Sequence, residues 1–390
     1  MSSANKLMDL AAALVAFLGH TAICVWFFNR LHAMAWPCRV IRLLERAILL
    51  FAAVVLLVYG TRWLATGVCV YAGQPLTTLD YLWLAYPLAC FAAALLAVPN
   101  WAVPKLLART PAALVSNHTT RVDLVREIGQ RPTGTRATAL FAAIPSNEIF
   151  ALAVQTKQVR LPRLPAALAG LRIAHLSDLH MTGRFTRPFY EEVVRLTNGL
   201  EPHLIALTGD ICEKEKCLEW IEPVLGKLTA RYGKFFVLGN HETRLADVAP
   251  LRKLLAEAGF IDVAGRWLEH SVANTRVLLA GTELPWFGTS PEMSAAPDGP
   301  LRILLSHSPD QLPWARQAGF DLMLAGHNHG GQIRLPLIGP LITPSRYGSR
   351  YAGGLYHEPP TLLHVTRGIA GLHPLRFNCP PELALLVLEP

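Results

Sequence analysis

Five short apolar runs between residues 171 and 325 each lead into a motif that carries aspartate, asparagine or histidine. The runs are four to six residues long and bounded by turn-forming residues, which is typical of strands buried on both faces. The motifs are Asp178-Leu179-His180, Gly209-Asp210, Gly239-Asn240-His241-Glu242, Ser306-His307-Ser308 and Gly326-His327-Asn328-His329. A chain with this pattern is constrained to bring polar strand ends together.

Segments with helical spacing separate several of these runs, at residues 189–196, 217–232 and 245–258. Alternation of short buried strands with helices indicates an α/β domain in which helices cover a sheet. In open α/β sheets, ligand sites gather at the carboxyl ends of the strands. We therefore expect the five motifs to share one site.

The residue types in the motifs are those that bind divalent metal ions. The candidate ligands are Asp178, His180, Asp210, Asn240, His307, His327 and His329. In extended backbone, residues two apart point to the same side, so Asp178 and His180 are expected to reach one ion together. Asp210 has two oxygens and can bridge two ions, and Asn240 offers a neutral carbonyl oxygen. Mixed imidazole and carboxylate ligands suit Mn, Fe, Zn or Co better than Ca or Mg.

Three long apolar stretches precede the motifs, over residues 10–28, 47–59 with an extension to 70, and 81–103. The first and third are long enough for the ~20 residues that cross a ~30 Å hydrocarbon core. The second is weaker because Arg62 interrupts it. The first has no small-residue cleavage site of a signal peptide after it. We predict a transmembrane region over residues 1–104 with about three spanning helices, and two as the alternative.

The arginines around these stretches predict an orientation. The first connection carries four of them, at positions 30, 39, 42 and 46, and the second carries only Arg62. Because cytoplasmic loops are enriched in Lys and Arg, the amino terminus is expected outside and the large carboxyl-terminal part in the cytoplasm. This predicts a multi-pass protein of the cell inner membrane; with only two spans, the same arginines give a conflicting answer. Residues 105–165 are expected to be a linker or membrane-proximal segment, and residues 166–390 the main domain.

The ordered set of five motifs resembles that of the calcineurin-like metallophosphoesterase superfamily. The run Gly326-His327-Asn328-His329-Gly330-Gly331-Gln332 with Arg334-Leu335-Pro336, and the later Arg376-Phe377-Asn378-Cys379-Pro380-Pro381-Glu382, resemble its membrane-anchored bacterial branch. The resemblance covers roughly residues 160–390. It implies an α/β fold with a β-sandwich flanked by helices, and a cofactor of two divalent metal ions, Mn, Fe or Zn.

The resemblance also implies a role for each residue. Asp178, His180 and His329 would hold the first metal, Asn240, His307 and His327 the second, and Asp210 would bridge both. His241 would be catalytic, protonating or stabilising the leaving oxygen, and Asn240 would serve catalysis as a ligand. Two departures stand out: Glu242 occupies a position where much of the branch has Asp, and Cys212 and Glu213 follow Gly209-Asp210 where an acidic residue often comes earlier.

These features predict a dinuclear metal-dependent hydrolase of phosphodiester or pyrophosphate bonds that acts at the membrane. The branch includes enzymes that act on UDP-2,3-diacylglucosamine in lipid A biosynthesis, so a lipid-linked substrate of this kind is the leading candidate. The apolar stretch over residues 335–342 allows two interpretations, ordinary core packing or a lip that dips toward the bilayer or holds an acyl chain.

Two alternatives stay open. One is a phosphodiesterase or phosphatase for soluble nucleotides or phosphoproteins, and the other is a non-catalytic membrane scaffold. The expected partners are the lipid bilayer and a phosphorylated small-molecule or lipid substrate. Nucleic acid is not expected, because the sequence has no basic stripe with interleaved aromatic residues. The oligomeric state is not predicted.

Overall fold

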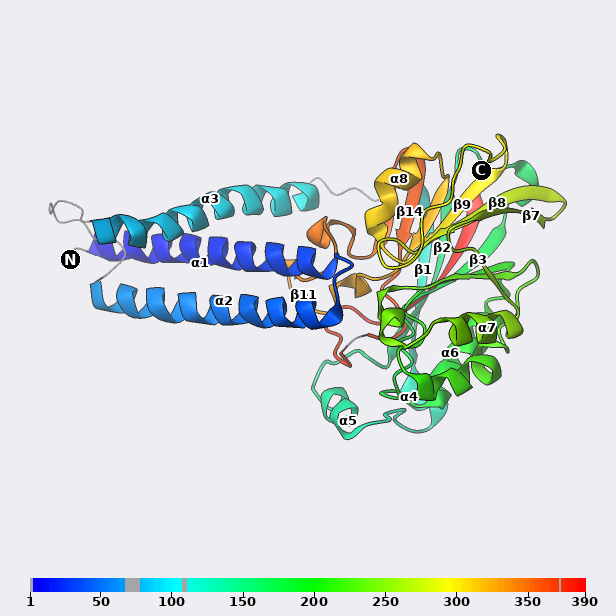
Figure 1. The fold of residues 1–390 in the computed structure, drawn as a ribbon, viewed down its shortest axis with the longest axis horizontal. Coiled ribbons are helices and arrows are strands. Elements are labelled where there is room, and N and C mark those ends of the chain that lie inside the picture. Colours follow the sequence, from blue (N-terminus) through cyan, green and yellow to red (C-terminus); the bar gives the residue numbers. More distant parts are fainter. Residues whose placement is uncertain (1–2, 67–77, 107–110, 372) are drawn as a thin grey trace. The chain divides into compact units, whose positions relative to one another are not determined.

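The computed structural model describes residues 3–66, 78–106, 111–371 and 373–390, and it divides the chain into two compact units, residues 1–110 and 111–390. The first unit contains three long helices, α1 (Ser3–His32), α2 (Cys38–Thr66) and α3 (Thr78–Leu106). The three helices expected before the motifs are therefore confirmed (Figure 1). Residues 67–70, the possible extension of the second apolar stretch, lie outside the described residues.

Two of these helices are long and apolar enough to cross a membrane, over Leu7–His32 and Trp83–Val103. Only 11% of the residues in the most apolar window of each are buried, which argues against a core helix of a soluble protein. Length and composition thus make α1 and α3 candidate membrane spans, and the three spans stay a prediction.

A polar contact joins the three helices. On α1, His20 Nδ1 lies 2.6 Å from the Tyr86 hydroxyl of α3, and His20 Nε2 lies 3.3 Å from the carbonyl oxygen of Ala52 on α2. Both ring nitrogens of this buried side chain thus have a partner. Such pairing is required of polar groups in an apolar environment.

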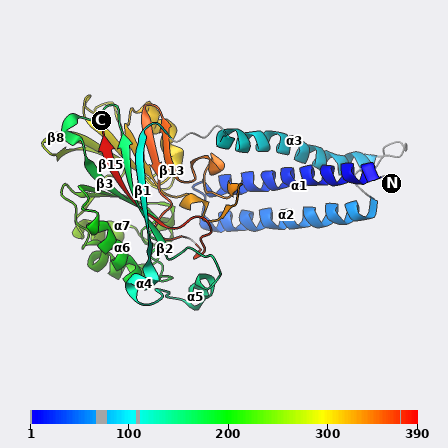
Figure 2. The same ribbon diagram turned by 180° about the vertical axis from the view of Figure 1, so that it is seen from behind.

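The second unit is built on two large sheets (Figure 2). The seven-stranded sheet has the order β1 (Leu114–Asp123), β2 (Ala151–Arg160), β15 (Glu382–Glu389), β3 (Leu171–Leu176), β4 (Leu204–Thr208), β5 (Lys234–Val237) and β6 (Phe260–Asp262). The six-stranded sheet has the order β13 (Gly354–Glu358), β14 (Thr361–Val365), β10 (Leu322–Ala325), β9 (Leu301–Ser306), β8 (Thr275–Thr282) and β7 (Trp267–Val272). Within them, β3 to β6 run parallel, as do β8, β9, β10 and β14.

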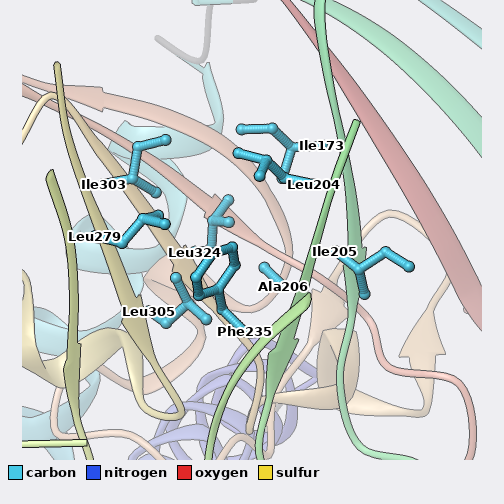
Figure 3. A pocket seen from close by; sticks show the side chains of 9 residues that line it. All are labelled: Ile173, Leu204, Ile205, Ala206, Phe235, Leu279, Ile303, Leu305 and Leu324. Carbon is cyan, nitrogen blue, oxygen red and sulfur yellow. The ribbon is translucent and has the colours of Figure 1, made fainter. Parts of the chain in front are cut away.

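Alternation along the strands sorts the side chains into layers. On β3, Ile173 packs into the core between the two sheets, whereas Ala174 packs into the core under the helices, because successive strand residues point to opposite faces. Figure 3 shows Ile173 and Phe235 of one sheet with Leu305 of the other, lining a small space between the sheets.

Helices cover the outer faces of the sandwich. The helix α6 (Arg187–Gly199) and the helix α7 (Ala249–Glu257) pack on the seven-stranded sheet, and α8 (Leu312–Gln317) packs on the six-stranded sheet. The expected β-sandwich flanked by helices is therefore confirmed. The helix expected over residues 217–232 is instead a 3-10 segment, Glu215–Trp220, followed by a π turn, Ile221–Leu225.

The expected linker, residues 105–165, is largely part of the second unit. Within it, β1 and β2 pair antiparallel at the edge of the large sheet. The helices α4 (Leu124–Ile128) and α5 (Arg136–Ala142) connect these two strands in the sequence. The domain boundary in the structure is thus Pro111 and not residue 166. The sequence carries no strand signal at β1 because seven of its ten residues are exposed consecutively, so it has no apolar run.

A buried cluster of charges holds three strands together. Lys157 Nζ on β2 lies 2.5 Å from Glu382 Oε1 on β15, and Arg367, which follows β14, donates to Glu382 Oε2 at 3.0 Å. Burial acts to raise the pKa of Glu382, but Lys157, His364 and Arg367 hold that pKa well below its usual value. The carboxylate therefore stays ionised in the folded protein.

Substitution Glu382→Gln should lower the free energy of unfolding by about 3–5 kcal/mol, because it leaves buried cations without a counter-charge. The expected measurement is a melting temperature of the full chain in detergent lower by roughly 5–10 °C. This stabilisation should be present above the ordinary glutamate pKa of about 4.3 and be lost as the pH falls toward the depressed folded value.

The matched control is Glu269→Gln, since Glu269 pairs with Arg276 at 3.2 Å on the surface. Exposed pairs contribute about 0–1 kcal/mol, so this variant should melt close to the wild type. Equal melting temperatures for the two variants would contradict a structural role of the buried cluster.

Candidate metal centre

The five motifs lie together at one edge of the sandwich. Each begins within two residues after the end of β3, β4, β5 or β10, or at the last residue of β9. Strands β3, β4 and β5 are parallel in one sheet, and β9 and β10 are parallel in the other. Parallel strands end at the same edge, so the topology itself collects the motifs where such sites are usual.

Most of the predicted ligands have a left-handed backbone conformation. Asp178, His180, Asp210, His327 and His329 have φ angles of 56°, 46°, 52°, 70° and 49°. The extended backbone expected at Asp178 and His180 is therefore wrong, although the two side chains still converge. This conformation costs non-glycine residues about 1–2 kcal/mol each, and strain of this kind concentrates at functional sites.

Hydrogen bonds between the loops maintain this conformation. The amide of Asp178 donates to the Gly209 carbonyl at 3.0 Å, and the amide of His180 donates to the Asp210 carbonyl at 2.8 Å. Gly209 itself has a φ of +86°, and a Cβ there would lie 2.6 Å from His307 Nδ1. Glycine is required at this position because the loops approach too closely for any side chain.

One group of side chains surrounds the end of β3. Its members are Asp178, His180, Asp210 and His329, all buried and with ligand atoms within 4.8 Å of one another. His180 Nε2 lies 3.1 Å from His329 Nε2, and His329 Nε2 lies 3.4 Å from Asp178 Oδ1. His180 Nε2 is also 3.7 Å from Asp210 Oδ2.

A second group shares Asp210 with the first. Its other members are His307, His327 and Asn240, with His307 Nε2 at 3.3 Å from Asp210 Oδ2. His327 Nδ1 is 3.1 Å and Asn240 Oδ1 is 3.0 Å from the same His307 nitrogen. All seven predicted ligands thus lie in one cluster, and Asp210 stands where the two groups meet.

These distances fit a metal centre. Ligand atoms at about 2.0–2.2 Å from a tetrahedral or octahedral ion lie about 2.8–3.6 Å from one another. Five of the six distances given above fall in this range, and the sixth is 3.7 Å. His180 Nδ1 faces Glu213 and His307 Nδ1 faces the Thr208 carbonyl. These contacts at Nδ1 fix the two rings so that their Nε2 atoms are directed into the cluster.

Charge in the cluster also fits a cation. Asp210 Oδ2 is buried and accepts no hydrogen bond among the described residues. Burial acts to raise the pKa of Asp210, but His307 and His241 hold it well below its usual value, so the carboxylate is ionised. Burial lowers the pKa of His327 and His329 well below the ordinary histidine value. Neutral imidazoles beside a carboxylate are the form that binds divalent metals.

Glu213, which sequence analysis noted only as a departure, connects the ligands to His241. Its Oε1 lies 2.5 Å from His180 Nδ1, and its Oε2 lies 3.1 Å from His241 Nδ1. Arg244 also donates to Glu213 Oε2. Both carboxylate oxygens of Glu213 are thus close to a histidine Nδ1, a position from which the carboxylate can orient both rings. The spacing of Glu213 from Gly209-Asp210 was visible in the sequence, but not its two partners.

Glu242 holds the backbone of two motif loops by accepting hydrogen bonds from their amides. Its carboxylate accepts from the amides of Asp210 at 3.1 Å, Ile211 at 2.6 Å, Cys212 at 3.0 Å and Gly239 at 2.6 Å. One buried side chain therefore fixes the loop after β4 against the loop after β5. The departure from Asp to Glu leaves this support complete.

Two further residues bound the site. The Trp286 ring centroid lies 5.0 Å from that of His327 and 5.6 Å from that of His307, so the indole covers the second group. Arg376 is fully buried and donates to the His329 carbonyl at 2.9 Å. Neither contact follows from local sequence, since both partners are distant along the chain.

Comparison with known proteins identifies the family. The calcineurin-like phosphoesterase family matches residues 171–331. The metallophosphoesterase YkuE of Bacillus subtilis (strain 168), which is named as uncharacterized, is 32% identical over 235 residues, covering 58% of this chain and 82% of that protein. Phosphodiesterase YaeI of Escherichia coli (strain K12) is 30% identical over 224 residues, covering 56% and 83%.

A third relative is UDP-2,3-diacylglucosamine pyrophosphatase LpxG of Chlamydia trachomatis serovar D, 26% identical over 286 residues, with 58% of this chain and 86% of that protein covered. The fold, the buried Asp/His cluster and these relatives define a metallophosphoesterase, a hydrolase of phosphoester bonds. The chain belongs to the calcineurin-like phosphoesterase family.

Substitution Glu213→Gln should reduce kcat/KM on bis(p-nitrophenyl) phosphate about 10–100-fold, the usual effect of removing a residue that orients metal-bound histidines. The carboxamide keeps the volume of the side chain but loses the charge that His180 and His241 face. Turnover and bound metal per chain should be measured on the same preparation.

Glu215→Gln is the matched control, because Glu215 lies two residues further along the same loop, is exposed, and accepts from the Ala246 amide at 3.1 Å. Its activity should equal that of the wild type. A positioning role for Glu213 would be refuted by equal activities of the two variants.

Proposed function

We propose that this protein is a dinuclear metal-dependent hydrolase of phosphodiester or pyrophosphate bonds that acts at the membrane on a lipid-linked substrate. The observation that carries the proposal is the position of Asp210, whose Oδ2 lies 3.7 Å from His180 Nε2 of one group and 3.3 Å from His307 Nε2 of the other. One carboxylate shared by two ligand groups supports two adjacent cations.

Each residue has a role in this proposal. Asp178, His180 and His329 would hold one cation, Asn240, His307 and His327 the other, and Asp210 both. Cations bound there would neutralise charge on the phosphoryl oxygens and make a water molecule acidic enough to attack phosphorus near neutral pH. The Asn240 carbonyl adds a neutral oxygen, so the second group carries less negative charge than the first.

His241 is proposed to supply the proton that the leaving oxygen needs. Its side chain is 8% exposed at the rim of the cluster, and its Nε2 lies 3.8 Å from Asp210 Oδ2. Since Glu213 faces Nδ1, Nε2 is the atom directed to the reacting groups. A histidine held in this way can donate a proton to an alkoxide or phosphate as the phosphorus–oxygen bond breaks.

A lipid-linked substrate such as UDP-2,3-diacylglucosamine is supported by three observations. The relative LpxG is named for that substrate. Two helices of this chain have the length and composition of membrane spans. With three spans, the basic residues of the first connection favour a multi-pass inner-membrane protein with the catalytic unit in the cytoplasm, which is where a nucleotide-activated lipid would be available. Cleavage of this substrate would place the protein in lipid A biosynthesis.

The metal requirement is tested with a generic diester. Chelation should abolish hydrolysis of bis(p-nitrophenyl) phosphate, and Mn²⁺ should restore it. Asn240→Ala should lower the metal content and the activity together, because it removes a proposed ligand. His241→Asn should keep the metal content but reduce kcat about 10²–10⁴-fold. A wild-type protein with full metal content and no turnover would support the scaffold alternative instead.

The substrate is tested by following UMP release from UDP-2,3-diacylglucosamine in detergent with Mn²⁺. Wild type is expected to release UMP and Asn240→Ala is not. If the wild type cleaves the generic diester but releases no UMP, the lipid A assignment fails. Hydrolysis of soluble nucleotides with unchanged efficiency in that case would favour the soluble-substrate alternative.

A further inference from the structure

The loop after the last motif projects an apolar tip from the catalytic unit. We define the apolar hairpin as residues 333–342, which contain the two short paired strands β11 (Arg334–Leu335) and β12 (Gly339–Pro340). Its large apolar side chains at positions 333, 335, 337, 338 and 342 are all exposed, and Leu337 at the tip is 100% exposed. The core-packing interpretation of this stretch therefore does not describe its tip.

The tip displays an apolar residue where a turn usually carries a polar one. Leu337 has a φ of +63°, a conformation that glycine or asparagine adopts with less strain. The Ile338 amide donates to the Pro336 carbonyl at 2.7 Å and closes the turn. From Leu335 to Ser345 the sequence contains no ionisable side chain. Arg334 and Arg346 flank this apolar segment directly.

The hairpin is fixed to the loop that carries His329. Arg334 Nε donates to the Gly330 carbonyl at 2.8 Å, and the Arg334 amide donates to the Phe377 carbonyl at 2.9 Å. A Cβ on Gly331 would lie 2.3 Å from Pro340 Cβ, which shows how closely the base of the hairpin packs. The tip thus has a defined position relative to the metal centre.

A second exposed apolar surface accompanies it. Leu140 on α5 is 74% exposed, and Phe141 and Ile144 beside it are also exposed. Asn147 Nδ2 donates to the carbonyls of Phe141 at 2.8 Å and Pro374 at 2.9 Å, which attaches this segment to the chain near Arg376. Figures 1 and 2 show α5 and the hairpin at the same end of the second unit.

The chain itself indicates what these surfaces meet. The last candidate membrane span ends at Val103 and the second unit begins at Pro111. Eight residues span at most about 29 Å when fully extended, so a unit tethered in this way stays close to a bilayer. Contiguous exposed apolar groups mark an interaction site, and arginines next to them suit an interface with lipid headgroups.

We propose that the apolar hairpin inserts into the interfacial region of the bilayer and holds the entrance of the metal centre at the level of the lipid headgroups. This inference rests on the proposed membrane location and deepens it. The inserted tip orients the second unit, and lipid-linked phosphates reach the metal centre without leaving the membrane surface. Soluble diesters need no such orientation.

The first test locates the hairpin without using activity. The full chain is reconstituted in vesicles that contain a phospholipid with a photoactivatable group in its acyl chain, and labelled peptides are identified by mass spectrometry. Labelling is expected within residues 333–342 and within the helix Leu7–His32, which serves as the internal control. Labelled helices with an unlabelled hairpin, or unlabelled helices, would overturn the proposal, as would cross-links from the hairpin to a second copy of the chain instead of to lipid.

The second test separates lipid from soluble substrate. Leu337→Asp should lose the hairpin label and reduce kcat/KM on bilayer-embedded UDP-2,3-diacylglucosamine about tenfold or more, the order expected when one leucine no longer leaves water. Its rate with bis(p-nitrophenyl) phosphate should stay at the wild-type level. Val115→Asp places the same charge on β1, where Val115 is 48% exposed, and should change neither the label nor either rate.

The two proposals fail in different ways. If the wild type does not cleave UDP-2,3-diacylglucosamine, the proposed substrate is refuted, while labelling still decides the position of the hairpin. If Leu337→Asp lowers the rates with both substrates equally, the hairpin supports the metal centre and does not position it at the membrane.

Discussion

The buried carboxylate of Asp210 is the constraint on which the rest of the catalytic unit depends. An ionised group with 1% exposure is costly to bury, and its burial is compensated only by cations or strong hydrogen-bond donors. Its Oδ1 accepts from the His241 amide at 2.8 Å, and its Oδ2 points at the histidines of two groups. Asp210 lies in the loop after β4, and the loops after β3, β5, β9 and β10 each bring a side chain or a backbone amide close to it.

That constraint explains why several buried side chains around the site hold the motif loops and the ligands in position. The left-handed conformation of Asp210 is held by Glu242, which accepts hydrogen bonds from the amides of Asp210 and Ile211. His180 is held by Glu213, and His329 is held through its carbonyl by Arg376. Each of these three supports is a buried side chain of an ionisable residue. Together they hold the ligand side chains facing one another.

The sequence predicts the ligands of this site better than it predicts the edge strands of the sheet and the residues that hold the ligands in place. Buried strands of parallel sheets have apolar runs, so β3, β4, β5, β9 and β10 could be recognised and the motifs placed at their ends. The edge strand β1 has exposed polar residues and no such run, and β2 alone gave no separate signal. The extended geometry inferred from the spacing of Asp178 and His180 failed, because the paired loops impose positive φ angles that spacing does not reveal. Glu213, Trp286 and Arg376 were not assigned to the site because their partners are brought close only by the folded sheets.

The position of the last ligand also bears on how substrate choice can arise in this fold. His329 and the apolar hairpin belong to one continuous segment. The Arg334 amide donates to the Phe377 carbonyl and the Asn378 side chain donates to the Arg334 carbonyl, which joins that segment to the chain near Arg376. A displacement of the hairpin would therefore strain the carbonyl contacts of Gly330 and His329. With the hairpin in the bilayer interface, the height of the metal centre above the membrane is fixed by the same hydrogen bonds that orient a ligand. Variation at the exposed tip can then alter which substrates reach the site while the ligand geometry stays unchanged, because Leu337 contributes to neither core nor ligands.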